Sequence, residues 1–513
     1  MYYLKSIIPQ SIKNIYHLFQ AILANFWYGF PSRRINPHTN FILASLINIL
    51  HSHKIGVGVK IIGVTGTNGK TTTVQMIAKI LEEAGKKIAV ASTINFKLNG
   101  EEWVNKTKFT TLSSFQVQKF IKKSAESGSE YLVLEISSHS LDQYRVWGIK
   151  YHVAVITNVT REHLDYHETM ESYRKAKLKL FKKAKTAVIN LDMENPEEYI
   201  EYKTDNIYLY SCRPERVERV EGSQDSSTSL GMTKIIIAEN IKLGIDKSEY
   251  EISAQGGPAS GWQNTNFTLN LPGIFNIENA LAATCVGLSE NIGLETIKTA
   301  LEKIKVIPGR MDRVENNRGL NIIIDYAVTP DSLAKLYELI KNIRDNSPKT
   351  GNGSRIVAVF GACGERDRGK RPIMGEIVSK YADYIIITNE DPYREDPQRI
   401  IDEIFKGVIE KNKNNETEPD KSSNFQFPIS NFQTNHNDQI YNDGKIPNYK
   451  VEGTNCWRIL DRREAIKKAL QIAKSGDFII VTGKGAEETM AVGRERIPWN
   501  DRKVIEEELQ KLQ

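Results

Sequence analysis

The stretch that decides the fold is Gly63-Val64-Thr65-Gly66-Thr67-Asn68-Gly69-Lys70-Thr71-Thr72. It follows an apolar run at 60–66 and opens a helical pattern at 70–84, which is the context of a phosphate-binding loop. Glycines let backbone N–H groups wrap a phosphate, and the N-terminus of the next helix favours an anion. Lys70 is placed to reach the β- and γ-phosphates, and Thr71 to put its hydroxyl on Mg²⁺. The strict G-x-x-x-x-G-K-[ST] spacing requires glycine where Val64 stands, so the loop is a variant.

Around this loop, apolar β-branched runs alternate with helical patterns. Such alternation predicts a mostly parallel sheet with helices on both faces. Between 212 and 271 the pattern changes to a smaller β region, entered through a polar stretch at 214–229. The expected strands of this first part are 60–66, 87–93, 131–136, 153–159, 186–190, 235–238 and 267–271.

A second α/β pattern begins after Arg310. Its expected strands are 322–325, 356–360, 384–388 and 478–481. We therefore expect an α/β protein with a helical N-terminal segment over 1–58, a central P-loop-like parallel-sheet domain over 59–309 and a C-terminal Rossmann-like domain over 310–513. Residues 411–450 are rich in Asn, Ser, Lys and Gln and cannot bury enough apolar area to offset the entropy of ordering, so we expect a disordered surface insertion there.

The N-terminal segment has no formally charged side chain between Asn14 and Ser32. Apolar residues recur at helical spacing, at 12, 15, 18/19, 22/23 and 26/27. Interspersed polar residues weigh against a membrane span, and no A-x-A site marks a signal peptide. Three alternatives stay open: a helix that packs its apolar face on the next domain, an interfacial membrane helix, and a span.

The composition narrows the class of protein. The chain has 513 residues, of which 40% are hydrophobic and 26% charged, as in soluble globular proteins. The net charge, 69 − 63 = +6, comes with no basic block, so we expect no nucleic-acid partner. The four cysteines, Cys212, Cys285, Cys363 and Cys456, form no C-x-x-C pattern, which argues against a cysteine zinc site and a disulfide scaffold.

Two further polar motifs follow apolar strands. Glu135 and Ser137 lie in L-E-I-S-S-H at the end of one strand, where ligands bind in doubly wound sheets, so Glu135 can hold the Mg²⁺ that Thr71 touches. The run 157–167 carries two histidines and two acids after another strand, which suggests a metal or phosphate site. From the residues alone, an ordinary strand-end cap and a solvated turn remain the alternatives.

Eight motifs in order resemble the Mur ligase family of ATP-dependent amide ligases. Within that family the chain is most similar to the tripeptide synthetases, which add the third peptide residue to a cell-wall precursor. The motifs are the loop at 63–72, E-I-S-S-H-S-L-D at 135–142, T-N-V-T-R-E-H-L-D-Y-H at 157–167, L-P-G-I-F-N-I-E-N-A-L at 271–281, P-G-R-M at 308–311, D-Y-A-V-T-P-D at 325–331, G-A-C-G-E-R-D-R-G-K-R-P at 361–372 and G-K-G-A-E at 483–487.

The resemblance implies roles at the matching positions. Lys70, His163 and Lys177 would be catalytic, and Mg²⁺ would be held by Thr71, Glu135, His163 and a carbamylated Lys177, whose anionic oxygen suits a hard cation. From the sequence alone, Lys177 is one of several helix lysines that a protein surface would carry. The nucleotide would contact Gly66, Thr67, Asn68, Gly69, Lys70, Thr71, Thr72, Asn279, Arg310 and Asp325. The sugar–peptide would contact Thr110, Thr111, Ser137 and Arg145, and the incoming amino acid Arg394, Gly483 and Glu487.

The sequence also departs from the family. Family members carry an N-terminal domain that binds uridine diphosphate, whereas the pattern of residues 1–58 here predicts apolar helical structure, so we expect that domain to be missing or replaced. Val328 and Ala486 stand where the family has histidines. The family's diaminopimelate motif D-N-P-R aligns with Glu390-Asp391-Pro392-Tyr393, and Arg394 comes one place later.

The resemblance implies a cytoplasmic ATP- and Mg²⁺-dependent ligase of peptidoglycan synthesis. An acceptor carboxylate would attack the γ-phosphate of ATP, and the amine of a free amino acid would then attack the acyl phosphate. We expect a muramyl-peptide acceptor, a diamino acid (meso-diaminopimelate or lysine) and a monomer, with peripheral membrane contact through residues 1–30 as an option. The alternatives are a ligase for a lipid-linked wall precursor, a folylpolyglutamate synthetase-like glutamate ligase, and a binding-only pseudoenzyme. The last would be expected to lack Lys70, Glu135 or Lys177.

Overall fold

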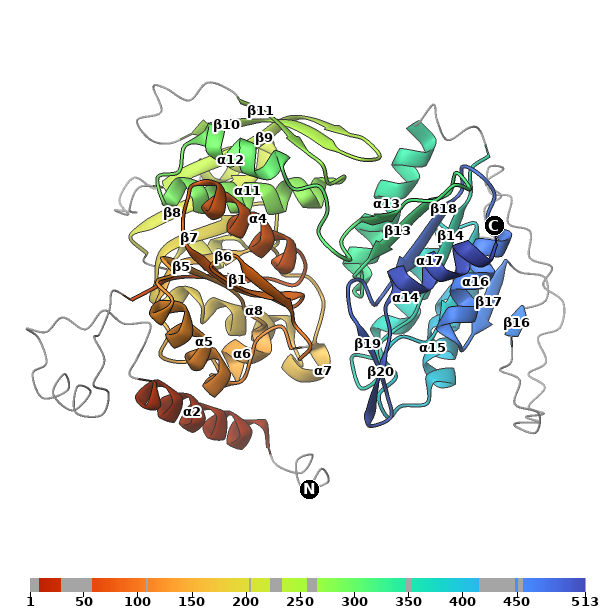
Figure 1. Ribbon diagram of the computed structural model, residues 1–513, viewed down its shortest axis with the longest axis horizontal. Helices are drawn as coiled ribbons and strands as arrows, with labels where there is room; N and C mark the ends of the chain where they lie inside the picture. Colours follow the sequence, from red (N-terminus) through yellow and green to blue (C-terminus); the bar gives the residue numbers. More distant parts are fainter. Residues whose placement is uncertain are drawn as a thin grey trace, which may run out of the picture. The chain divides into compact units, whose positions relative to one another are not determined.

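The computed structural model describes residues 9–28, 58–107, 109–202, 204–221, 233–255, 265–346, 353–414, 448–450 and 455–512. They form two compact units (Figure 1). The first unit comprises Met1–Thr160 and Tyr166–Lys305, and the second comprises Arg161–Asp165 and Val306–Gln513, as far as these ranges are described.

An 11-stranded sheet runs through the first unit in the order β11-β10-β9-β8-β7-β6-β1-β5-β2-β3-β4. Strand β1 is central because it pairs in parallel with both β5 and β6. The parallel core carries continuous apolar runs, as expected for strands covered on both faces. The strands are β1 Lys60–Thr65, β2 Ile88–Ala91, β3 Asn95–Leu98, β4 Glu101–Val104, β5 Tyr131–Glu135, β6 Tyr151–Ile156, β7 Ala184–Asn190, β8 Asn206–Ser211, β9 Thr233–Leu243, β10 Ser248–Gln255 and β11 Thr265–Leu269.

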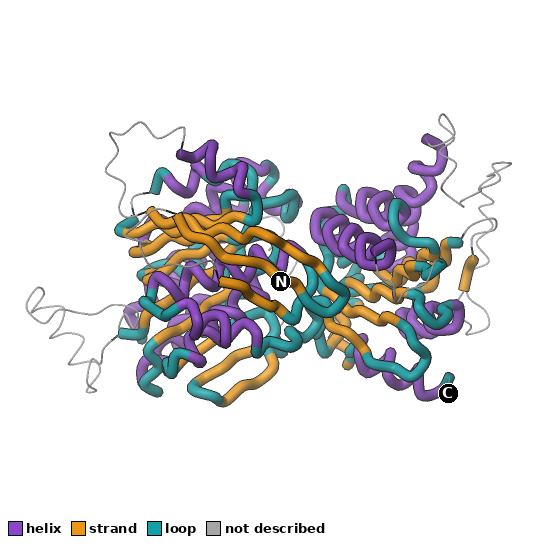
Figure 2. The backbone as a smooth tube through the Cα atoms, turned by 90° about the horizontal axis from the view of Figure 1, so that it is seen from above, coloured by secondary structure: helices purple, strands orange, loops and turns teal. Residues whose placement is uncertain are grey.

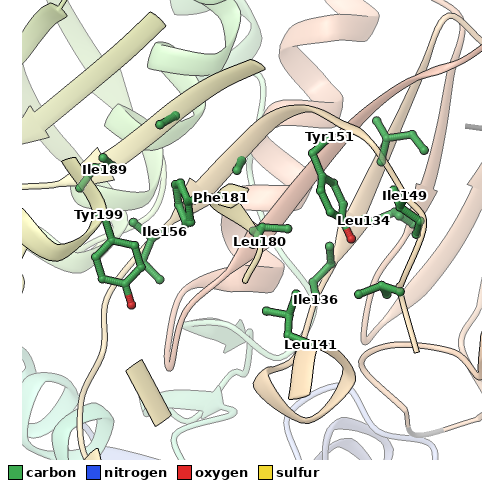
Figure 3. Packing of buried hydrophobic residues seen from close by; sticks show 14 of the residues in the cluster. Leu134, Ile136, Leu141, Ile149, Tyr151, Ile156, Leu180, Phe181, Ile189 and Tyr199 are labelled. Atoms are coloured by element: carbon green, nitrogen blue, oxygen red, sulfur yellow. The ribbon is translucent and has the colours of Figure 1, made fainter. Parts of the chain in front are cut away.

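Helices cover both faces of this sheet (Figures 1 and 2). Figure 1 shows α4, α11 and α12 on one side and α5, α6 and α8 on the other. Leu134, Ile156 and Ile189 of the strands pack with Phe181 and Tyr199 in the core of the second side (Figure 3). The helices are α2 Gln10–Trp27, α4 Lys70–Glu83, α5 Ser114–Glu126, α6 Ser138–Asp142, α7 Leu164–His167, α8 Met170–Leu178, η1 Phe181–Lys183, α9 Glu197–Ile200, α10 Pro214–Glu221, α11 Ile274–Ser289 and α12 Leu294–Glu302.

The second unit contains a seven-stranded sheet in the order β12-β13-β18-β14-β15-β17-β16 and a separate hairpin of β19 and β20. The five inner strands are parallel, and β12 and β16 pair antiparallel at the edges. The strands are β12 Asp312–Val314, β13 Asn321–Asp325, β14 Ile356–Phe360, β15 Tyr384–Thr388, β16 Asn448–Lys450, β17 Cys456–Ile459, β18 Phe478–Thr482, β19 Thr489–Val492 and β20 Glu495–Pro498. The helices are α13 Pro330–Asn346, α14 Lys370–Ser379, α15 Pro397–Asn414, α16 Arg462–Ile472 and α17 Asp501–Lys511.

The predicted fold class is confirmed, with three local corrections. The expected smaller β region is not separate, because β9 pairs in parallel with β8 and carries β10 and β11 as an antiparallel extension of the same sheet. The expected insertion at 411–450 is too long at both ends, since α15 continues to Asn414 and β16 begins at Asn448. Residues 415–447 lie outside the described residues.

The third correction concerns α2. Of the three alternatives left open for this segment, a helix that packs its apolar face on the next domain does not fit, because most of the large apolar side chains of α2 are exposed. The side of α2 that packs on the first unit is small and polar instead, with Ala21, Ala24 and Asn25 buried. Within the described part of the chain, no helix has the length and hydropathy needed to cross a membrane.

Candidate functional site in the first unit

The loop between β1 and α4 has a conformation that requires glycine at position 69. Gly69 has φ +82°, and a Cβ on it would lie 2.2 Å from Oδ1 of Asn279. The same Asn279 oxygen accepts a hydrogen bond from Thr73 at 3.2 Å, so α11 is fixed against the first turn of α4. On the other side, the backbone N–H of Asn68 donates to Oδ1 of Asn158 at 2.9 Å. Contacts with Asn279 and Asn158 thus fix the shape of the loop.

Lys70 lies over this loop. Its Nζ donates to the carbonyl oxygens of Gly66 and Thr67, at 3.1 Å and 2.8 Å. The ammonium therefore lies within the turn that the sequence predicts to wrap a phosphate. Thr72, another predicted nucleotide contact, is buried in the first turn of α4.

Glu135 is the centre of a hydroxyl network at the end of β5. Its side chain is buried, and Thr71 donates to both carboxylate oxygens at 3.1 Å. Thr93 also contacts both, through its backbone N–H at 2.7 Å and its hydroxyl at 2.8 Å. Sequence reasoning missed Thr93, although it ends the predicted strand 87–93 next to Glu135's strand and so had the position of a site residue.

The four residues predicted to hold the sugar–peptide lie together beside Glu135. Thr111 donates to the carbonyl oxygen of Glu135 at 3.1 Å and accepts from the N–H of Ser137 at 2.9 Å. Arg145 donates to the carbonyl oxygen of Thr111 at 2.8 Å, and the Thr110 hydroxyl accepts from that of Thr93 at 3.2 Å. Burial lowers the pKa of Arg145 to about 10, which marks it as a largely desolvated cation.

Lys177 is a buried lysine, with 1% of its surface exposed, so the alternative of a surface lysine is wrong. Its Nζ lies 4.3 Å from the centre of the Tyr173 ring, and the Tyr173 hydroxyl lies 3.0 Å from that of Thr67 in the phosphate loop. Helix α8 therefore brings Lys177 to the same end of the sheet as Lys70. A buried amine of this kind is costly unless it is compensated or chemically modified.

His167 is a neighbour of this lysine that sequence reasoning did not select. Its Nε2 lies 3.0 Å from the Ser138 hydroxyl in the predicted substrate motif. Burial is the main cause that lowers the pKa of His167 to about 4, and the charge of Lys177 acts in the same direction. The signal was available in the run 157–167, where this histidine is the last residue.

The described residues contain no group of three or more His, Cys, Asp or Glu side chains arranged to hold a metal ion. The predicted Mg²⁺ site is of a different composition. A buried carboxylate and a hydroxyl lie side by side in Glu135 and Thr71, and these hard oxygen donors fit Mg²⁺. The chemistry of this donor set is compatible with the ion, and a carbamylated Lys177 would add another oxygen.

Candidate residues in the second unit and comparisons

His163 does not belong to the same unit as the other predicted metal ligands. It belongs to the segment Arg161–Asp165, which groups with the second unit, and it has φ +57°. Arg310 and Asp325 also belong to this unit. The N–H of Met311 donates to Asp325 at 2.8 Å, and the Arg310 guanidinium lies 4.6 Å from the centre of the Tyr326 ring.

Asp325 is a candidate proton-binding group. Burial raises its pKa to about 6, against the opposing charge of Arg310. The charges of Asp325 and Arg310 thus interact, which is compatible with both residues contacting one nucleotide.

Glu487 and Gly483 lie around a buried lysine. Lys484 is fully buried and pairs with Asp391 at 2.9 Å and with Glu487. Glu487 is mostly buried and also accepts from the Tyr326 hydroxyl at 3.4 Å. The Glu487–Lys484 pair is therefore not an ordinary surface ion pair.

Glu390 was missed as a neighbour of this pair. A Cβ on Gly483 would lie 2.6 Å from its Oε2, so glycine is needed for the carboxyl to approach. Burial and the adjacent Asp391 charge raise the pKa of Glu390 to about 7. Arg394, the candidate clamp for a second carboxylate, is instead half-exposed and donates to Glu365 at 2.8 Å.

Two family models match the chain. The Mur ligase middle domain matches residues 64–287, and the Mur ligase, glutamate ligase domain matches residues 309–485. The chain belongs to the Mur ligase family. Members of this family are ATP-dependent ligases that form amide bonds, so the predicted family and enzyme class are confirmed.

Named relatives of this Mur ligase cover most of its length. It is 34% identical over 492 residues to the UDP-N-acetylmuramoyl-L-alanyl-D-glutamate–2,6-diaminopimelate ligase of Syntrophomonas wolfei, covering 95% of this chain and 81% of the relative. It is 31% identical over 486 residues to the UDP-N-acetylmuramyl-tripeptide synthetase of a Roseiflexus species, covering 92% of this chain and 82% of the relative.

Solved structures agree with the fold. A UDP-N-acetylmuramoyl-L-alanyl-D-glutamate–2,6-diaminopimelate ligase superposes with a TM-score of 0.52 at 26% identity, covering 90% of this chain and 80% of that one. The MurF ligase of Thermotoga maritima in complex with ADP superposes with a TM-score of 0.55 at 16% identity, covering 89% and 81%. The second likeness shows the fold alone.

Proposed function

We propose that this Mur ligase adds an amino acid to a UDP-N-acetylmuramoyl-peptide in peptidoglycan synthesis, in the cytoplasm, through an acyl phosphate. The observation that carries the proposal is the arrangement at the ends of β1 and β5. Lys70 lies over the phosphate loop, and Thr71 and Glu135 form a buried oxygen pair beside it. The named relatives are ligases of this reaction class.

In this proposal the predicted nucleotide- and metal-binding residues have distinct tasks. The backbone of 66–72 and the side chains of Lys70 and Asn279 position the triphosphate, and Lys70 stabilises the charge that moves between phosphates. Thr71, Glu135 and carbamylated Lys177, with His163, would hold Mg²⁺, which when bound supplies Lewis-acid stabilisation of phosphoryl oxygens. Glu135 is kept in place by Thr93, which accounts for the two hydrogen bonds that it makes.

The acceptor would lie along Thr110, Thr111, Ser137 and Arg145. Arg145 is the desolvated cation of this group, so it suits an anionic part of the acceptor. The carboxylate of the acceptor attacks the γ-phosphate of ATP. The bond from that phosphorus to the bridging oxygen breaks, and ADP leaves. The incoming amine then attacks the acyl carbon, and phosphate leaves with the acyl oxygen.

We further propose that the incoming amino acid is a diamino acid. Asp391 and Glu487 both form ion pairs with Lys484. Because the cluster has two carboxylates and one ammonium, it can bind the ammonium group of an incoming diamino acid. Meso-diaminopimelate and lysine both fit this chemistry. Arg394 could bind a second carboxylate after exchanging its partner Glu365.

Several finer assignments are part of the same proposal. Arg310 and Asp325 would contact the nucleotide from the C-terminal domain, 310–513, while 59–309 would form the central ATP-binding domain behind the helical segment 1–58. We propose a monomer. Peripheral membrane contact through residues 1–30 is also proposed, and α2 is the described part of that stretch.

The test is amino-acid-dependent release of phosphate from ATP by the purified full chain. We expect release only when UDP-N-acetylmuramoyl-L-alanyl-D-glutamate and a diamino acid are both present, with a product heavier by one residue in mass spectrometry. A lipid-linked muramyl-peptide and a folate with glutamate form the comparison arms. Turnover confined to the folate arm would overturn the proposal, and turnover confined to the lipid-linked arm would reassign the acceptor.

A further inference from the structure

Helix α2 packs on the first unit through its small, polar side. Ala21, Ala24 and Asn25 have no exposed surface. Asn25 donates to the carbonyl oxygen of Trp147 at 2.8 Å, and a Cβ on Gly148 would lie 2.7 Å from the Asn25 amide nitrogen. The Asn25 side chain thus packs directly on the backbone of the loop at Trp147 and Gly148, and this contact fixes the orientation of α2 about its own axis.

The first turns of α2 are held by polar contacts of the same kind. Asn14 donates to Asp142 at 3.1 Å, and Gln10 donates to the Tyr166 hydroxyl at 3.0 Å. Asp142 also pairs with Lys179 at 2.7 Å. Asp142 ends α6, the helix that begins after Ser137, so α2 is joined to an element of the proposed acceptor site.

The opposite side of α2 is a continuous apolar surface. We call it the outer face, and its eight large side chains are each 40–70% exposed. They recur at three- and four-residue spacing, so they share one side of the helix. The outer face consists of Ile12, Ile15, Tyr16, Phe19, Ile22, Leu23, Phe26 and Trp27. A globular protein ordinarily turns such a stripe inward, and an exposed patch of this kind marks an interaction surface.

The sequence that contains this helix is basic and has no acid. Residues 1–59, which precede the first strand of the sheet, contain five Lys or Arg and no Asp or Glu, so they carry +5. The rest of the chain carries (69 − 5) − 63 = +1. Most of the net positive charge of the sequence therefore lies in the segment before β1. Within α2 itself the only charged side chain is Lys13.

We propose that the outer face of α2 docks on the interfacial region of an anionic lipid bilayer. Tyr16, Phe19, Phe26 and Trp27 are aromatic side chains of the type that lies at the boundary between headgroups and acyl chains. The acid-free, basic sequence around them is complementary to a negatively charged leaflet.

The docked orientation has a consequence for the acceptor site. Because α2 is joined to Asp142 and Tyr166, the membrane surface would lie at a fixed angle to the unit that carries Thr111, Ser137 and Arg145. The inference is about where the protein works, and it holds whether or not the ligase reaction is the proposed one.

The experiment is co-sedimentation of the full chain with vesicles. We expect binding to phosphatidylcholine vesicles that contain about a third phosphatidylglycerol, weaker binding to phosphatidylcholine alone, and loss of the difference at about 1 M salt, where the screening length is about 3 Å. Phe19→Ser with Trp27→Ser should weaken partition at least about tenfold, because two interfacial side chains are removed. Leu243→Ser with Ile497→Ser is the control, since both are large apolar residues, 40% and 39% exposed, that lie elsewhere.

The same double variant of α2 also tests other possible occupants of the outer face. Equal vesicle binding by the α2 variant and the wild type, or no binding by the wild type, would overturn the proposal. A concentration-dependent dimer that the α2 variant abolishes would assign the face to a second copy. A lower unfolding temperature of the α2 variant, without vesicle binding by the wild type, would assign it to residues 29–57 of the same chain. Phosphate release with a soluble acceptor should be unchanged in the α2 variant, so that failure of docking and failure of the ligase proposal give different results.

Discussion

Thr71 and Glu135 are joined by two hydrogen bonds of 3.1 Å, from one hydroxyl to both oxygens of a buried carboxylate. The contact links the first turn of α4 to the end of β5, the strand that pairs with β1 at Val64 and Glu135. A parallel pairing therefore sets the distance between a phosphate loop and a carboxylate that are 64 residues apart. Any ligand held by this pair depends on the register of the sheet.

The phosphate loop gives the first prediction. Lys70→Ala should lower phosphate release at least about 100-fold, because the ammonium meets charge that builds in the transition state. Lys79→Ala, on the same helix, is the control and should leave turnover near that of wild type. Circular dichroism should show both variants folded. Near-normal turnover in folded Lys70→Ala would falsify the assignment of this loop.

The second prediction concerns the buried amine of Lys177. Lys177→Ala should lose most activity and regain part of it with small carboxylates such as acetate, which can replace an anionic oxygen ligand. The wild type should be stimulated by bicarbonate. Lys175→Ala is the matched control, since Lys175 lies two residues away on α8, is exposed and pairs with Glu171. Activity of Lys177→Ala equal to that of the control would leave Lys177 a packing residue.

Specificity for the amino acid is the third prediction. Glu487→Gln should raise the KM for the diamino acid more than about tenfold, because an acidic partner of the ammonium is removed. Arg394→Ala should weaken use of meso-diaminopimelate and spare lysine, whereas Arg399→Ala, an exposed arginine paired with Glu403, should affect neither. Phosphate release measured across an amino-acid panel checks this. Better turnover with glutamate or alanine than with either diamino acid would show that the pocket is wrongly assigned.

The fourth prediction is the acid sensitivity of the first unit. Glu290 accepts from His152, Lys60 and Tyr131 at 2.5, 2.6 and 2.7 Å. Burial alone would raise the pKa of Glu290, but these hydrogen bonds lower it to about 2. Since the folded-state pKa lies below the ordinary value of 4.5, this stabilisation is complete above pH 4.5 and is lost as the pH falls toward 2.

Glu290→Gln should therefore lower the free energy of unfolding at pH 7 by about 2 kcal/mol and flatten its decline below pH 4.5. Urea unfolding between pH 7 and pH 3 measures both effects. Glu126→Gln is the control, because that exposed carboxylate pairs with Lys122 on the helix surface. Identical slopes for wild type and Glu290→Gln in acid would show that the group does not control the acid response.

The sequence predicted most inner strands, because their apolar, β-branched runs are typical of buried strands, but it missed β8 and β17, which lie inside the two sheets. It missed the hairpin of β3 and β4, whose second strand is exposed and has no apolar run. It placed Glu135 and Lys70 at the site from motif and strand position. It did not identify Thr93 or His167, because the distances that select them are set by tertiary packing. The burial of Lys177 and the outward turn of the apolar side of α2 also depend on neighbours that are distant in sequence.

The central position of β1 has a consequence for how the chain is made. Lys60 pairs with Tyr131 and Ile62 with Val153, so neither edge of β1 can be paired until those later residues have left the ribosome. For that interval the strand presents an apolar, unpaired backbone, which is the condition under which nascent chains aggregate. Emergence of residue 156 from the ribosome should therefore be the point at which the nascent chain becomes resistant to protease, and slower translation before that point should increase its dependence on chaperones.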